Sequence, residues 1–212
     1  MVKTLYLIRH GETEGAESRR YKGSIDVPLS GNGIEQIKKT AAFISAEARK
    51  AGRPEAASGL TAIYCSPLSR ALKSAEIIAE PCGLKPVVVD ELRERHFGIW
   101  EGMSFDEIRE VYPDEFKAWA DNPLKYSPIG GESTLGVRDR VINTLDWILQ
   151  NHMSDNIAII AHGGVNRIIL CHVMGMPLEN IFRVEQDFGC VNIIEFWDRY
   201  PVVKLLNGGL IK

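Results

Sequence analysis

The stretch Leu7-Ile8-Arg9-His10-Gly11-Glu12-Thr13 decides the fold when it is considered together with Ala161-His162-Gly163-Gly164 far downstream. In both places a short apolar run, rich in β-branched residues, ends in a histidine that is followed at once by glycine. Such runs are typical of buried parallel strands, so each histidine should lie where its strand gives way to a loop. Because ligands bind at the carboxyl ends of strands in open α/β sheets, we expect Arg9, His10 and His162 to meet at one edge.

Strand and helix patterns alternate along the chain, which indicates α/β layering. A helix should begin at the N-cap Ser30, and a second helix should begin with Ser66 as N-cap and Pro67 in its first turn. The last two strands are joined by a tight turn and should be antiparallel. Expected strands cover 2–8, 60–65, 86–89, 157–161, 191–197 and 202–206, expected helices also cover 135–149 and 165–174, and residues 49–59 form a linker.

Length and composition restrict the classes of protein. The 212 residues, 45% of them hydrophobic, fit one domain over 1–212 with an inserted cap at roughly 100–131. The net charge of −3 and the lack of a basic run exclude non-specific nucleic-acid binding. No apolar stretch is long enough for a membrane span, and the four cysteines have no metal-ligand spacing. We expect a cytoplasmic protein with buried thiols and leave open whether it forms a homodimer.

The charged residues near the strand ends suit a phosphoryl group. Arg9 and Arg70 would each offer a planar fork to the phosphate oxygens. Gly163 lets the backbone approach an anion at the start of a helix. A neutral imidazole is a competent nucleophile, so one of the two histidines could attack. Glu94, which follows the third expected strand, is the candidate acid for the leaving oxygen.

The sequence resembles the histidine phosphatase superfamily, with its phosphoglycerate-mutase-like fold. The resemblance covers nearly the whole chain and rests on motifs that occur in the family's order: 7–13, 64–71, Glu94 with Glu101-Gly102, 131–133 and 161–164. It implies a three-layer α/β/α sandwich with a mostly parallel central sheet and a small helical cap. It further implies a phosphohistidine on His10, a phosphate pocket of Arg9, Arg70 and His162, and Glu94 as proton donor and then base. No metal or cofactor is implied, and we also expect substrate contacts from Gly23, Arg95 and Gly163.

One position departs from the family's pattern. Members often have an asparagine six residues after the nucleophile, where this chain has Ala16. Arg20, Lys22 or a backbone N–H could replace its phosphate contact. Cys65 suggests a different nucleophile, but cysteine-dependent phosphatases use Cys-x5-Arg with a glycine-rich loop. Here only four residues separate Cys65 from Arg70, none of them glycine, so we interpret Cys65 as a buried strand residue.

The same phosphoenzyme could serve a phosphatase or a mutase. A mutase must hold a second anionic group, yet the cap has few basic residues (Arg109, Lys117 and Lys125) among many acidic ones. We therefore favour hydrolysis of a small phosphomonoester whose leaving group has some apolar surface, with the alpha-ribazole phosphatase branch as the nearest match and broad-specificity phosphatases next. The alternatives are a cofactor-dependent phosphoglycerate mutase and a domain that binds phosphorylated ligands without catalysis.

Overall fold

Within the part of the chain that the structure describes, the sheet at the centre of the molecule has six strands in the order β3-β2-β4-β1-β5-β6. The structure is a computed structural model that describes residues 3–18, 20–50, 59–152, 156–198 and 200–209. The first four strands in that order run parallel to their neighbours, whereas β5 is antiparallel to β1 and β6 is antiparallel to β5. The sheet is therefore mostly parallel, and the expected antiparallel pair is confirmed. The strands are β1 (Lys3–Arg9), β2 (Ala62–Cys65), β3 (Val87–Val88), β4 (Asn156–Ala161), β5 (Val191–Phe196) and β6 (Pro201–Gly208).

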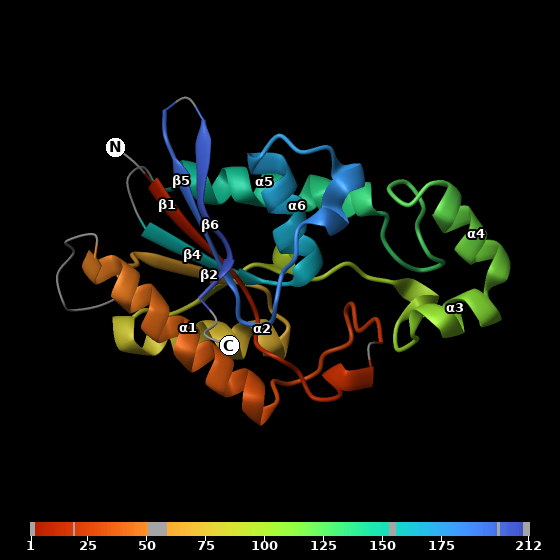
Figure 1. The fold of residues 1–212 in the computed structure, drawn as a ribbon, viewed down its shortest axis with the longest axis horizontal. Coiled ribbons are helices and arrows are strands. Elements are labelled where there is room, and N and C mark those ends of the chain that lie inside the picture. The colour runs from red at the N-terminus through yellow and green to blue at the C-terminus, as the bar shows by residue number, and fades with distance from the viewer. Residues whose placement is uncertain (1–2, 19, 51–58, 153–155, 199, 210–212) are drawn as a thin grey trace.

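Helices cover both faces of this sheet, which gives the expected three layers (Figure 1). Helices α1 (Gly31–Lys50) and α2 (Ser69–Ala79) lie on one face, and α5 (Thr134–Gln150) and α6 (Gly163–Val173) lie on the other. Side chains of β1 alternate between the two cores: Leu5 and Leu7 pack toward α5 and α6, while Tyr6 and Ile8 pack toward α1 and α2. A strand buried on both faces explains the continuous apolar run before Arg9.

The two helix starts predicted from serine have different outcomes. Ser30 caps α1 as predicted, because its Oγ accepts a hydrogen bond from the N–H of Gly33 at 3.0 Å. The start predicted at Ser66 is wrong, since α2 begins at Ser69 after Leu68, which provides no side-chain cap. The Ser66 Oγ accepts from the N–H of Leu68 at 3.3 Å, which holds the turn before the helix, and it also lies 2.8 Å from His162 Nε2. Of the expected linker, residues 51–58 lie outside the described residues.

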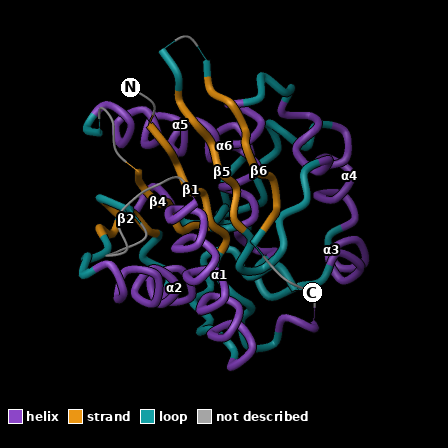
Figure 2. Tube along the Cα trace, turned by 60° about the vertical axis from the view of Figure 1, so that its left-hand side comes forward, coloured by secondary structure: helices purple, strands orange, loops and turns teal. Residues whose placement is uncertain are grey.

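The cap, residues 100–131, stands beyond the edge of the sheet and contains α3 (Phe105–Val111) and α4 (Pro113–Asp121) (Figure 2). Ser104 and Glu107 form a capping box at the start of α3, and Pro113 begins α4. Short 3-10 turns complete the described elements: η1 (Ala16–Ser18), η2 (Glu80–Cys82), η3 (Asp90–Leu92), η4 (Gly98–Trp100) and η5 (Leu178–Arg183). No helix in the described ranges has both the length and the apolar character needed to cross a bilayer.

Candidate active site

A cavity of about 780 Å³ opens between the cap and the carboxyl ends of the parallel strands. Charged and polar residues line its sheet end, and aromatic and aliphatic side chains of the cap line the other end. Most of the residues that the sequence analysis singled out lie in its wall: Arg9, His10, Gly23, Arg70, Glu94, Arg95 and Gly163. His162 lies directly behind them, with its ring centroid 5.1 Å from that of His10.

His10 follows β1 and is held with one ring nitrogen available. Its backbone N–H donates to the carbonyl of Ala161, and its own carbonyl accepts from Gly189. Its Nδ1 lies 2.7 Å from the carbonyl oxygen of Gly11. Because a carbonyl oxygen can only accept, Nδ1 carries the proton and the lone pair is on Nε2. Burial lowers the pKa of His10 well below 6.5, as do the charges of Arg9 and Arg70. The imidazole is therefore neutral and nucleophilic at neutral pH.

His162 lies between the end of β4 and the start of α6 and is completely buried beside His10. Its Nε2 is 2.8 Å from the hydroxyl of Ser66, and its Nδ1 has no hydrogen-bond partner in the described part of the chain. Burial lowers the pKa of His162 well below 6.5, and the neighbouring His10 lowers it further. A buried nitrogen without a partner is uncommon in native proteins and is typical of a position that a ligand completes.

Arg9 is held from the loop that precedes β5. Its Nη1 donates to the backbone carbonyl of Gln186 at 2.5 Å, and its Cζ lies 3.9 Å from the ring centroid of Phe188. The Gln186 side chain is itself fixed by the buried amide of Asn192. Sequence reasoning missed these residues. A signal existed, because the amino end of an antiparallel strand next to β1 lies at the same edge as the carboxyl end of β1.

Arg70 lies in the first turn of α2, as predicted, and points across the cavity floor. Its Nη1 donates to the carbonyl of Ile25 at 2.8 Å and its Nη2 to that of Gly23 at 2.7 Å. Gly23 has a φ of +50°, and a Cβ there would lie 2.3 Å from Oε1 of Glu101. Only glycine fits this turn without strain, and the turn presents the carbonyl to Arg70.

Glu94 is anchored by backbone donors near the histidines. One carboxylate oxygen accepts from Gly164 N–H at 3.0 Å and the other from Arg95 N–H, also at 3.0 Å. Arg140 of α5, which sequence reasoning missed, donates to the carbonyls of Arg93 and Glu94 and so holds this segment. A Cβ at Gly164 would lie 2.5 Å from Oε1 of Glu94, so this glycine is required for the carboxylate to approach α6.

Arg20 and Lys22, the two side chains proposed to replace the asparagine missing at Ala16, have different hydrogen-bond partners. Arg20 makes a bidentate ion pair with Glu107 of the cap at 2.5 and 2.6 Å. Lys22 lines the cavity, and its Nζ donates to Thr13 Oγ1 at 2.9 Å and to the carbonyl of Glu14. Partial burial lowers the pKa of Lys22, as does the charge of Arg70.

Arg95 lines the cavity, but its guanidinium is committed to the protein. It donates to the carbonyls of Glu132 and Tyr126 and to Thr134 Oγ1. These bonds fasten the end of the cap to the start of α5. A direct contact between Arg95 and the substrate stays a prediction.

Cys65 does not have the surroundings of a nucleophile. Its side chain is completely buried, and burial raises the pKa of its thiol to about 12. Among the described cysteines, only Cys82 is partly exposed, which differs from the prediction that all are buried. In the described ranges, no group of three His, Cys, Asp or Glu side chains is arranged to hold a metal ion.

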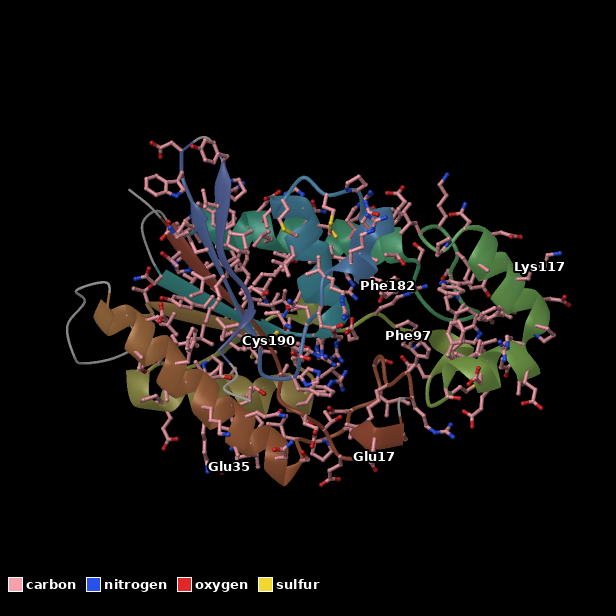
Figure 3. The ribbon with its side chains drawn as sticks, viewed as in Figure 1. Glu17, Glu35, Phe97, Lys117, Phe182 and Cys190 are labelled. Carbon is pink, nitrogen blue, oxygen red and sulfur yellow. The ribbon has the colours of Figure 1, made fainter. Side chains whose placement is uncertain are left out.

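The cap wall of the cavity is apolar, although the cap sequence is acidic. Cap residues in the wall are Trp100, Phe105, Ile108, Phe116, Trp119, Pro123 and Leu124. The cap is described in full, and none of its basic or acidic side chains lines the cavity. Figure 3 shows Lys117 on the outer side of the cap, whereas Phe97 and Phe182 lie between the cap and the body of the sheet. The cap therefore offers no basic side chain to a second anion at this wall, where it presents aromatic rings instead.

Known proteins resemble this chain in both sequence and fold. Residues 5–208 match the family model of the histidine phosphatase superfamily (branch 1). Phosphoserine phosphatase 1 of Hydrogenobacter thermophilus is 32% identical over 98% of this chain and 92% of its own. The adenosylcobalamin/alpha-ribazole phosphatase of Escherichia coli is 26% identical, over 98% and 97%. The crystal structure of the alpha-ribazole phosphatase from Shigella flexneri superposes with a TM-score of 0.86 at 26% identity, covering 99% of this chain and 98% of that one.

Proposed function

Because this chain belongs to branch 1 of the histidine phosphatase superfamily and is a phosphatase like its named relatives, we propose that it hydrolyses small phosphomonoesters through a phosphohistidine on His10. The observation that carries the proposal is the tautomer of His10. Its Nδ1–H donates a hydrogen bond to the carbonyl of Gly11, which leaves the Nε2 lone pair free in a site rich in positive charge.

In the first step, His10 Nε2 attacks phosphorus while the bond from phosphorus to the leaving oxygen breaks. Arg9 and Arg70 compensate the charge on the phosphoryl oxygens. Ser66 Oγ accepts from the N–H of Leu68 and can give its own proton to Nε2 of His162. The Nδ1–H of His162 is then a further donor to a phosphoryl oxygen.

Glu94 moves the protons in both steps. It enters the first step as the carboxylic acid and gives its proton to the leaving oxygen. In the second step its carboxylate takes a proton from water as the water oxygen attacks phosphorus. The bond from phosphorus to His10 Nε2 breaks, which releases inorganic phosphate and restores the neutral imidazole.

Lys22 supplies the phosphate contact expected from the asparagine that Ala16 replaces. Of the candidates for this contact, Arg20 is engaged by the cap, whereas Lys22 lines the cavity beside Thr13. Its charge contributes to the lowered pKa of His10, which supports a position near the reacting atoms.

The apolar cap wall supports a substrate whose leaving group has an aromatic or aliphatic face. A cavity of about 780 Å³ with rings from Trp100 and Trp119 is larger and more apolar than a serine leaving group requires. An alpha-ribazole phosphate, with its fused aromatic rings, would cover more of this wall than phosphoserine. We therefore propose an aryl or nucleoside-like phosphomonoester and place alpha-ribazole 5′-phosphate first among the named candidates.

A panel of phosphomonoesters tests this proposal directly. The panel comprises para-nitrophenyl phosphate, alpha-ribazole 5′-phosphate, phosphoserine and phosphoglycerate, with release of inorganic phosphate and transfer to a second hydroxyl measured for each. We expect phosphate release to be highest for the compounds with ring systems and to continue with a chelator present. Transfer without release would indicate a mutase. Binding without turnover would indicate a phospho-ligand-binding domain.

A further inference from the structure

Arg167 of α6 is a guanidinium in the cavity wall that the proposed mechanism does not use. Its side chain is 19% exposed and is held on one side only. Nε donates to the carbonyl of Val184 at 2.8 Å, and Nη2 donates to Glu185 at 3.2 Å. Nη1 has no acceptor among the residues that the structure describes. These bonds fix the plane of the guanidinium and leave one pair of N–H donors for a ligand.

The free end of Arg167 lies close to Arg9. A Cβ at Gly163 would lie 3.2 Å from Nη1 of Arg167 and 3.5 Å from Nε of Arg9. That Nε is buried and also has no hydrogen-bond partner within the described ranges. Two guanidinium groups that approach the same glycine repel each other, and an anionic group between or beside them offsets the repulsion. Their arrangement therefore favours a negatively charged acceptor at this wall.

This acceptor is distinct from the phosphoryl group. Arg70 approaches the histidines from the loop at 23–25, whereas Arg167 is held by residues 184–185 on the other flank of Arg9. The cations that contribute to the lowered pKa of His10 are Arg9, Arg70 and Lys22, and the charge of Arg167 acts on Arg9 instead. Arg70 and Arg167 are therefore anchored to different segments, and the free donors of Arg167 are available to a part of the ester that Arg9 and Arg70 do not hold.

We propose that Arg167 binds a carboxylate on the leaving group of the substrate, an inference that rests on the proposed phosphatase function. A carboxylate fits the geometry because a fixed guanidinium edge recognises its two oxygens. Glu185 already offsets part of the charge of Arg167, which suits a single negative charge better than a second phosphate. Among the aryl and nucleoside-like phosphomonoesters, the preferred substrates are then those whose leaving group also has a carboxylate, and alpha-ribazole 5′-phosphate, which has none, ranks behind them.

A matched pair of substrates tests the proposal with Arg167→Met. Carboxyphenyl phosphate and carbamoylphenyl phosphate, each as para and meta isomers, have nearly the same shape and differ in charge. We expect the wild type to prefer the carboxylate in kcat/KM. In Arg167→Met the carboxylate should lose roughly ten- to hundred-fold, the range for a charge-assisted hydrogen bond, and the carboxamide less than about three-fold. The control Arg138→Met removes an exposed arginine of α5 that pairs with Asp139, and it should change neither substrate.

The outcomes separate this inference from the proposed function. Equal losses for both substrates in Arg167→Met would assign Arg167 to the phosphoryl group or to folding, and would overturn the inference while the phosphatase stands. Equal kcat/KM for both substrates in wild type and variant would also overturn it. If the wild type hydrolyses neither compound, the proposed function fails. Calorimetric binding of the same pair to wild type and to Arg167→Met then still decides whether Arg167 distinguishes the carboxylate from the carboxamide.

Discussion

The two ends of the cavity are built in different ways. At the sheet end, backbone carbonyls hold the charged groups: Gln186 holds Arg9, and Gly23 and Ile25 hold Arg70. In the cap, aromatic rings hold one another, with Phe105 and Phe116 at 5.0 Å between centroids and Trp100 stacked on Tyr126 at 5.5 Å. Backbone contacts fix a geometry whatever the neighbouring side chains are, whereas ring contacts change with each substitution. The sheet end thus determines the reaction, whereas substitutions in the cap can change the substrate preference without altering the reaction.

Replacing His10 should have the largest effect. In His10→Ala no other group at the sheet end can attack in line, so turnover should fall by at least about a thousand-fold on every substrate. Rapid acid-free quenching of the wild type with a phosphorus-labelled ester should trap an acid-labile, alkali-stable adduct on His10. His172→Ala, which removes an exposed histidine of α6, is the matched control. Full activity in His10→Ala would remove the premise that one imidazole carries the reaction.

Glu94→Gln should have a large effect that depends on the leaving group. Esters with poor leaving groups, such as alkyl phosphates, need the proton and should slow by roughly a hundred-fold or more. Para-nitrophenyl phosphate needs little protonation in the first step and should slow far less in a single turnover. The control Glu91→Gln changes an exposed carboxylate in the same segment. The same factor for both substrates would show that Glu94 positions the site and does not donate a proton.

Sequence reasoning located the sheet end well because its signals are local. Apolar runs that end in His10 and His162 place both side chains at one edge once parallel strands are assumed, and the structure brings the two rings together. The partners that hold those residues have no local signal, and the sheet topology indicates at most that the segment before β5 lies at the same edge. Gln186 and Arg140 act through tertiary hydrogen bonds between segments far apart in the chain. The Ser66 error has the same origin, because only the folded structure shows that its hydroxyl faces His162.

The cap is helical, as the family resemblance implies, but the sequence does not show which of its side chains face the cavity. Counting charges along 100–131 predicts an acidic surface toward the substrate. The direction of each side chain decides what the cavity contains, and here the carboxylates have other partners. Glu107 pairs with Arg20, and Glu115 accepts a hydrogen bond from Tyr126. Composition reports the residues that a segment has, and packing determines which of them a ligand meets.

Lys22→Gln tests whether the sheet end includes a further cation. Loss of one charge-assisted hydrogen bond to the phosphoryl group should lower kcat/KM roughly ten-fold, by a similar factor for every ester. Lys38→Gln, on the exposed side of α1 where Lys38 pairs with Glu35, is the control. A loss confined to some leaving groups would place Lys22 with the specificity residues and would contradict its proposed phosphate contact.

Trp119→Ala tests the cap end of the comparison. The ring lines the cavity and contacts Phe105 and Phe116, so its loss should raise KM for aryl phosphates by roughly three- to ten-fold and leave kcat nearly unchanged. Trp119→Phe retains a ring and should restore most of the affinity, which distinguishes substrate contact from cap unfolding. Trp197→Ala, at a half-exposed site on the hairpin that ends β5, is the control. A change in kcat larger than that in KM would show that the cap also shapes the reaction.

The smallest effect concerns stability in acid, where the two ends should again differ. The pKa values of His10 and His162 are well below 6.5 in the folded protein, chiefly through burial. Below pH 6.5 these two histidines bind protons in the unfolded chain but stay neutral in the folded protein. The free energy of unfolding therefore decreases as pH falls. Each such histidine adds a slope of at most about 1.4 kcal/mol per pH unit.

His162→Gln should reduce this slope in urea unfolding between pH 7 and pH 5, whatever it does to stability at pH 7. His172→Gln, which replaces an exposed histidine of α6, is the matched control and should retain the full slope. Equal slopes for wild type and His162→Gln would mean that the buried histidines do not lower the free energy of unfolding in acid. That result would contradict the neutral imidazole on which the nucleophile depends.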